Sequence, residues 1–72
     1  LEETLDTILY CTRDKIIELL KGKQYKPNAE IKQAEDEINR IYRAVLSGQG
    51  SLSEFQDAVN IWERRAIENV RK

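Results

Sequence analysis

The sequence predicts an all-α fold, an antiparallel three-helix bundle with helices at about residues 1–21, 28–46 and 51–70. Three observations support this fold class: two adjacent stretches share one apolar rhythm, turn-forming residues interrupt the chain twice, and helix-capping residues follow each interruption. Short connections favour antiparallel neighbours, so we expect the helices to run up, down and up. Residues 1–72 should form a single small helical domain, and the lack of methionine indicates a trimmed or excised segment.

The first predicted helix carries a broad apolar face. Residues at helical spacing form this face: Leu1, Leu5, Ile8, Leu9, Thr12, Ile16, Leu19 and Leu20. A face of this width should contact two other helices. Cys11 lies at its edge, so we expect a buried and unreactive thiol. Gly22 favours a helix end after Lys21, and Pro27 prevents the helix from continuing.

The second and third predicted helices carry matching apolar seams with steps of three and four residues. The seam residues are Ile31, Ala34, Ile38, Ile41 and Val45 in the second helix and Leu52, Phe55, Val59, Trp62 and Ala66 in the third. Asn28 is a suitable N-cap, and Ser51 with Glu54 forms an S-x-x-E capping box. Because the glycine-containing segment 47–51 is short, the two helices should pack as an antiparallel hairpin similar to a coiled coil.

Composition argues against several classes of protein. The chain has no His and one Cys, so it lacks the commonest zinc ligand, the usual general base and a disulfide partner. No apolar run approaches the roughly 18 residues of a membrane-spanning helix. The formal net charge of −1 gives no overall attraction to nucleic acid or to acidic membranes. We therefore expect a cytoplasmic protein that is not an enzyme, holds no cofactor or metal, and does not contact a membrane.

Two apolar residues of the first helix lie outside its apolar face. Tyr10 and Ile17, seven residues apart, share one side of the helix, with Arg13 in their polar rim, and Ile61 lies on the back of the third helix. Two interpretations stay open for these four residues: incidental exposure, or an interface for another protein chain. A core built from 72 residues is marginal in size, so a helical dimer that completes the core is an alternative packing.

Basic residues should gather at one end of the bundle. An antiparallel arrangement brings together Lys21, Lys23, Lys26, Arg64, Arg65, Arg71 and Lys72. Cations at helix C-termini complement the helix dipoles, and the same cations are also able to contact phosphate. The acidic start of the second helix, which includes Glu30 and Glu35, lies at this end and opposes phosphate binding.

The sequence therefore predicts a small non-catalytic module for protein–protein interaction or oligomerisation, acting as a regulator, adaptor or assembly domain. Its partner would be another protein or a second copy of this chain. The alternative is a nucleic-acid-associated accessory domain that uses the basic end. Trp62 is expected in the core, whereas Tyr25 either caps the core or is exposed for contact.

Overall fold

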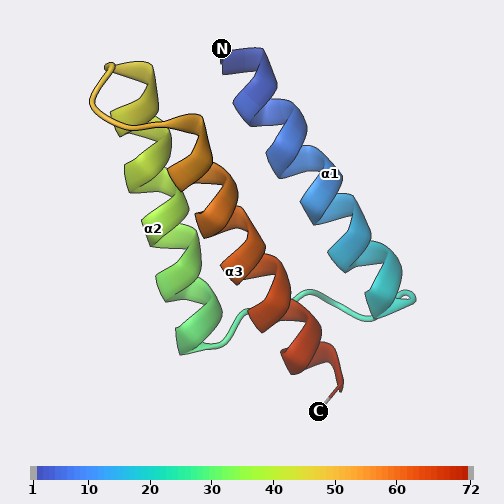
Figure 1. Cartoon of the computed structure of the whole chain (residues 1–72). Coiled ribbons are helices and arrows are strands. Elements are labelled where there is room, and N and C mark those ends of the chain that lie inside the picture. The colour runs from blue at the N-terminus through green and yellow to red at the C-terminus, as the bar shows by residue number, and fades with distance from the viewer. Residues whose placement is uncertain (1, 72) are drawn as a thin grey trace.

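The computed structural model describes residues 2–71 and confirms the predicted all-α three-helix bundle over that range. The elements are α1 (Glu2–Leu20), α2 (Ala29–Leu46) and α3 (Leu52–Arg71). Their observed ends agree with the predicted bounds to within one residue, because the local stop and start signals act as expected. The helices run antiparallel in succession, so the start of α1 and the start of α3 lie at the same end of the molecule (Figure 1).

Side-chain caps fix the starts of the second and third helices. The Oδ1 atom of Asn28 accepts a hydrogen bond of 2.9 Å from the backbone N–H of Ile31. The Oγ atom of Ser51 accepts one of 3.2 Å from the backbone N–H of Glu54. Each cap satisfies a donor that the first helical turn leaves without a partner. Both predicted N-caps are confirmed.

The reversal between α2 and α3 depends on two glycines. Gly48 has a φ of +84°, a left-handed conformation that a side chain would disfavour. The backbone N–H groups of Gln49 and Gly50 both donate to the carbonyl oxygen of Ala44, at 2.8 and 3.0 Å. A Cβ atom on Gly50 would lie 3.2 Å from the Cβ atom of Ala44, so the small residue allows the chain to fold back closely.

The predicted seams form the core of the α2/α3 hairpin. The buried residues of these two helices are Ile31, Ala34, Ile38, Val45, Phe55, Ala58, Val59, Trp62 and Ala66. Phe55 and Val59, in the N-terminal half of α3, are fully buried. Leu52 was expected in the seam, but its side chain is 44% exposed because it occupies the first residue of α3, beyond the packed region.

Helix α3 lies between the other two helices and packs against both (Figure 1). Helices α1 and α2 make little backbone contact with each other. The molecule is consequently flattened, with extents of 37 × 22 × 15 Å. A three-helix bundle with equal packing between all pairs would be rounder in cross-section. This asymmetry leaves the sides of α1 and α2 that face one another only partly covered.

Two predictions for α1 are wrong, the burial of Leu19 and the burial of Cys11. The buried residues of this helix are Leu5, Thr12, Ile16 and Leu20, whereas Leu19 is 44% exposed and Cys11 is exposed. The buried arc is narrower than predicted because α1 packs mainly against α3, and Cys11 and Leu19 lie one turn before and one turn after Lys15, on the side of α1 that α3 does not bury and that faces away from α2. Leu1, which was assigned to the same face, lies outside the described residues.

None of the helices in residues 2–71 combines the length and the apolar character needed to cross a membrane.

Truncating Phe55 tests the assignment of the core. Phe55→Ala should lower the free energy of unfolding by about 3–5 kcal/mol, because it removes a buried aromatic ring and leaves a cavity. Ile61→Ala is the control, since Ile61 is 47% exposed and its truncation should cost less than about 1 kcal/mol. Urea unfolding followed by Trp62 fluorescence measures both values. Equal losses in the two variants would contradict the assignment.

Candidate protein-binding groove

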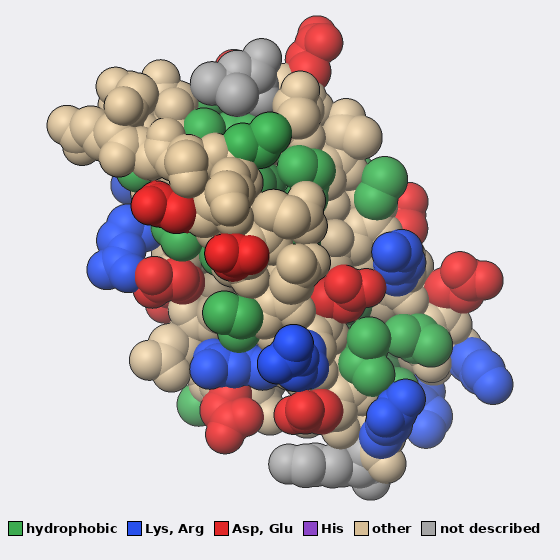
Figure 2. Space-filling view, viewed as in Figure 1, with side chains coloured by type: hydrophobic (Ala, Val, Ile, Leu, Met, Phe, Trp, Pro, Cys, Tyr) green, Lys and Arg blue, Asp and Glu red, His purple; other side chains and the backbone are tan. Residues whose placement is uncertain are grey.

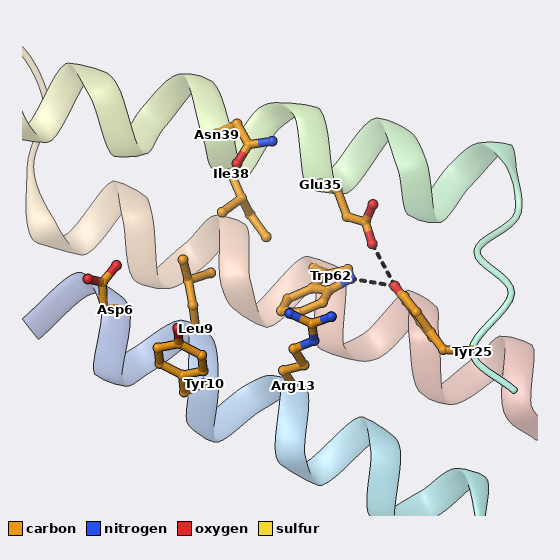
Figure 3. Close-up of a pocket in the computed structure, with 9 residues that line it drawn as sticks. All are labelled: Asp6, Leu9, Tyr10, Arg13, Tyr25, Glu35, Ile38, Asn39 and Trp62. Atoms are coloured by element: carbon orange, nitrogen blue, oxygen red, sulfur yellow. Dashed lines mark hydrogen bonds between the residues drawn. The ribbon is translucent and has the colours of Figure 1, made fainter. Parts of the chain in front are cut away.

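An open groove lies where α1 and α2 diverge over α3. It has a volume of about 390 Å³ and is lined by Asp6, Leu9, Tyr10, Arg13, Tyr25, Glu35, Ile38, Asn39 and Trp62. Figure 3 shows α1 and α2 as its two walls, with α3 between them and Tyr25 entering from the loop that joins α1 to α2. We call this feature the α1–α2 groove. It combines apolar surface with charged and amide groups, a mixture typical of recognition sites.

The indole of Trp62 closes the inner side of the groove and is held by hydrogen bonds. Trp62 is 7% exposed, which confirms its predicted place in the core. Its Nε1–H donates to the hydroxyl oxygen of Tyr25 at 3.1 Å, and that hydroxyl donates to Oε1 of Glu35 at 2.7 Å. These bonds link α3, the first loop and α2 (Figure 3). Of the two roles considered for Tyr25, the structure supports capping of the core.

A second tyrosine joins the two walls near the other end of the groove. The hydroxyl of Tyr42 on α2 donates to Oδ1 of Asp6 on α1 at 3.0 Å. The Tyr42 ring also meets the Phe55 ring edge-on, with centroids 6.1 Å apart and an interplanar angle of 60°. Tyr42 therefore fixes the spacing of α1 and α2 by a polar contact where apolar packing between these helices is sparse.

Both tyrosines favour their neutral forms. Burial, reinforced by the hydrogen bond to Glu35, raises the pKa of Tyr25 to about 12. Burial and the hydrogen bond to Asp6 raise the pKa of Tyr42. In each case a carboxylate accepts a hydrogen bond from the neutral phenol and would repel a phenolate. The two bonds are consequently intact across the neutral pH range.

Polar contacts also hold the loop and α1 against α3. Asn69 of α3 accepts a hydrogen bond from Asn28 at 3.3 Å and donates to the backbone carbonyl of Lys26 at 3.5 Å. Lys15 of α1 lies 3.9 Å from Glu63 of α3 on the side of α1 away from the groove. These contacts position α1 and the loop while the groove side of α1 stays uncovered.

The predicted interface residues do not form one surface. Tyr10 and Arg13 line the α1–α2 groove, and Ile17 follows Arg13 by one turn on the same side of α1. Tyr10 is 65% exposed and Ile17 is 51% exposed. Ile61 instead lines a separate shallow hollow between α2 and α3, together with Ala34. The structure thus brings three of the four residues together and places Ile61 elsewhere.

The elements that carry the predicted basic cluster lie at one end of the bundle, with acidic groups interspersed among the described members. Its members are the loop residues Lys21, Lys23 and Lys26 and the α3 residues Arg64, Arg65 and Arg71, whereas Lys72 lies outside the described residues. The guanidinium of Arg65 donates to the backbone carbonyl of Glu30 at 3.2 Å. Arg64 and Arg71 share a hollow with Glu63 and Glu68. Figure 2 likewise shows acidic and basic side chains intermixed over the visible face.

The two tyrosine–carboxylate bonds were not predicted from the sequence. Their partners are separated by 10 and 36 residues, so no local spacing reveals them. The available signal was the position of Tyr42 at the edge of a seam, since a half-buried phenol usually requires a polar partner. Within residues 2–71, no group of three or more His, Cys, Asp or Glu side chains is arranged to hold a metal ion.

Replacing Tyr25 tests the hydrogen-bonded inner side of the groove. A tyrosine ionisation step near pH 12, followed by absorbance at 295 nm, should be absent in Tyr25→Phe and retained in Tyr10→Phe. The pKa of Tyr25 in the folded chain lies above the ordinary value of 10.0, so the protonated hydroxyl contributes its full stabilisation of the folded state below about pH 10. It should be lost as the pH rises toward 12, so wild type should lose stability more steeply than Tyr25→Phe. Identical titrations would contradict this account.

Comparison with models of known protein families, with curated proteins and with solved structures finds no match to this chain.

Proposed function

We propose that this protein is a non-catalytic protein–protein interaction module that docks its partner on the α1–α2 groove and the adjoining side of α1. The single observation that carries the proposal is the exposure of Tyr10 and Ile17 beside that groove. The two side chains share one side of the helix, with Arg13 between them. Tyr10 and Ile17 provide an exposed aromatic and aliphatic surface next to this cation.

The physical argument is the cost of leaving this surface in water. Burial of apolar area is favourable by about 25 cal/mol per Å², so a partner that covers Tyr10 and Ile17 gains free energy that the free chain lacks. Tyrosine, tryptophan and arginine are also the side chains that dominate binding energy at protein interfaces. The groove contains one of each, Tyr10, Trp62 and Arg13.

The shape of the groove favours a helical partner. Helices α1 and α2 form walls on either side of α3, and a fourth helix between them would complete a four-helix arrangement (Figure 1). Recognition of an amphipathic helix in a groove is a recurring mode of protein binding. Such a partner would present apolar side chains to Leu9, Tyr10 and Ile38.

We also propose that the module acts as a regulator, adaptor or assembly domain in the cytoplasm. A single cysteine, exposed as Cys11, is compatible with a reducing compartment. The alternative function, nucleic-acid association, is supported by the common position of the first loop and the C-terminal part of α3 at one end of the bundle (Figure 1). It is weakened by the bond between Arg65 and the Glu30 carbonyl and by the acids beside Arg64.

Charge substitution on α1 tests the proposed function. The protein chains that wild type captures from a cell extract are purified, and their affinities are measured one at a time. Tyr10→Glu/Ile17→Glu should raise the dissociation constant of the true partner by at least about tenfold, because two carboxylates would be buried against apolar surface. Its melting temperature should stay close to that of wild type, since both side chains are exposed.

The matched control is Arg64→Asp/Arg71→Asp, which alters the hollow on α3 outside the groove. This variant should keep wild-type affinity for the partner. The proposal would be contradicted if every captured chain bound the folded α1 variant as tightly as wild type. Strong salt-dependent binding to an arbitrary duplex, lost in the Arg64/Arg71 variant, would support the alternative function.

A further inference from the structure

The charged residues on the groove side of α1 have a self-complementary order. Asp6, Tyr10 and Arg13 all line the groove and follow one another at helical spacings of four and three residues. An acid therefore lies one turn before the exposed aromatic ring and a base one turn after it. Reading the same helix in the opposite direction gives base, aromatic ring and acid.

We propose that the occupant of the groove is a second copy of this chain, with the two α1 helices antiparallel across a twofold axis beside Tyr10. In this arrangement each Asp6 faces the partner's Arg13, and each Tyr10 lies against the partner's Leu9 and Tyr10. This charge pair occurs twice because the twofold axis repeats it. The inference rests on the proposed function, since it names the partner of the same groove.

The orientation follows from the charges. Antiparallel packing brings each carboxylate to a guanidinium, whereas a parallel twofold dimer would place Asp6 against the partner's Asp6 and Arg13 against the partner's Arg13. Like charges that face each other across an interface disfavour that arrangement. The carboxylate of Asp6 bonds Tyr42 through Oδ1, which leaves Oδ2 to accept from the incoming guanidinium.

The groove also fits the partner's Tyr10 at the position next to the twofold axis. The bond between Asp6 and Tyr42 aligns the start of α1 with the end of α2, which places Leu9 and Tyr10 across from Ile38 and Asn39. A phenol ring entering there meets apolar surface, and the Asn39 amide offers a polar partner for its hydroxyl. Figure 3 shows Asn39 on the α2 wall opposite Leu9 and Tyr10.

The test is the mass of the intact chain measured by sedimentation equilibrium at concentrations up to about 1 mM. Wild type should populate a dimer. Arg13→Asp should raise the dimer dissociation constant at least about tenfold, because both symmetry-related pairs become repulsive. Asp6→Arg/Arg13→Asp should restore dimerisation, since opposite charges again face each other. In a parallel dimer, Arg13→Asp would not weaken dimerisation and Asp6→Arg/Arg13→Asp would not restore it.

Two controls separate dimer contacts from folding. Tyr42→Phe removes the hydrogen bond to Asp6 without changing charge. It therefore measures the loss of folding stability that Asp6→Arg/Arg13→Asp also suffers when this bond is removed. Arg64→Asp makes the same charge change away from the groove and should leave the dimer unchanged. Melting curves confirm that each variant is folded before its mass is interpreted.

The inference is overturned if wild type stays monomeric over this range, or if folded Arg13→Asp dimerises as wild type does. It is also overturned if the double variant melts like Tyr42→Phe and fails to regain the dimer. If the protein is a monomer and binds a different chain through Tyr10 and Ile17, the partner is not a second copy of this chain. In that case the dimer is overturned and the proposed function stands.

Discussion

The two-sided burial of α3 determines the rest of this structure. Phe55, Val59, Trp62 and Ala66 form one buried stripe, and α1 and α2 pack on either side of it. Because apolar burial is the dominant favourable contribution to folding, each outer helix is held mainly by α3. Helices α1 and α2 make little contact with each other, so their facing sides remain open.

Polar bonds set the width of that opening. Tyr42 joins α2 to Asp6 of α1, and Tyr25 joins the first loop to Glu35 of α2 and Trp62 of α3. Such bonds have directional requirements, so they define separation and register more sharply than apolar contact does. The groove is therefore a preformed feature of the folded chain, which reduces the conformational entropy that a docking partner must offset.

The sequence predicts the helices well because their signals are local. Asn28 and Ser51 act as caps within three residues of their bonding partners, and Gly48 allows the reversal where the seam of α2 ends. The groove could not be predicted, because it depends on which helix pairs pack. Leu19 and Cys11 illustrate this limit: their position on α1 is clear from the sequence, but they lie one turn from Lys15, on the side of α1 away from the groove, where neither α2 nor α3 buries them.

The candidate site was predicted in part. Tyr10, Arg13 and Ile17 were identified by helical spacing, which is preserved in the structure. Ile61 was grouped with them only because it is apolar and exposed, and it lies in a separate hollow. Tyr25 and Tyr42 act through partners distant in the sequence, so their structural role required the three-dimensional arrangement.

The central claim, that partners dock on the groove side of α1, is tested most directly by hydroxyl-radical footprinting of free and partner-bound protein. Tyr10 is 65% exposed in the free chain, so it should be oxidised readily there and protected when the partner is bound. Ile61, 47% exposed on a different surface, should react equally in both states. Unchanged oxidation of Tyr10 on binding, or protection of Ile61 in its place, would contradict the account.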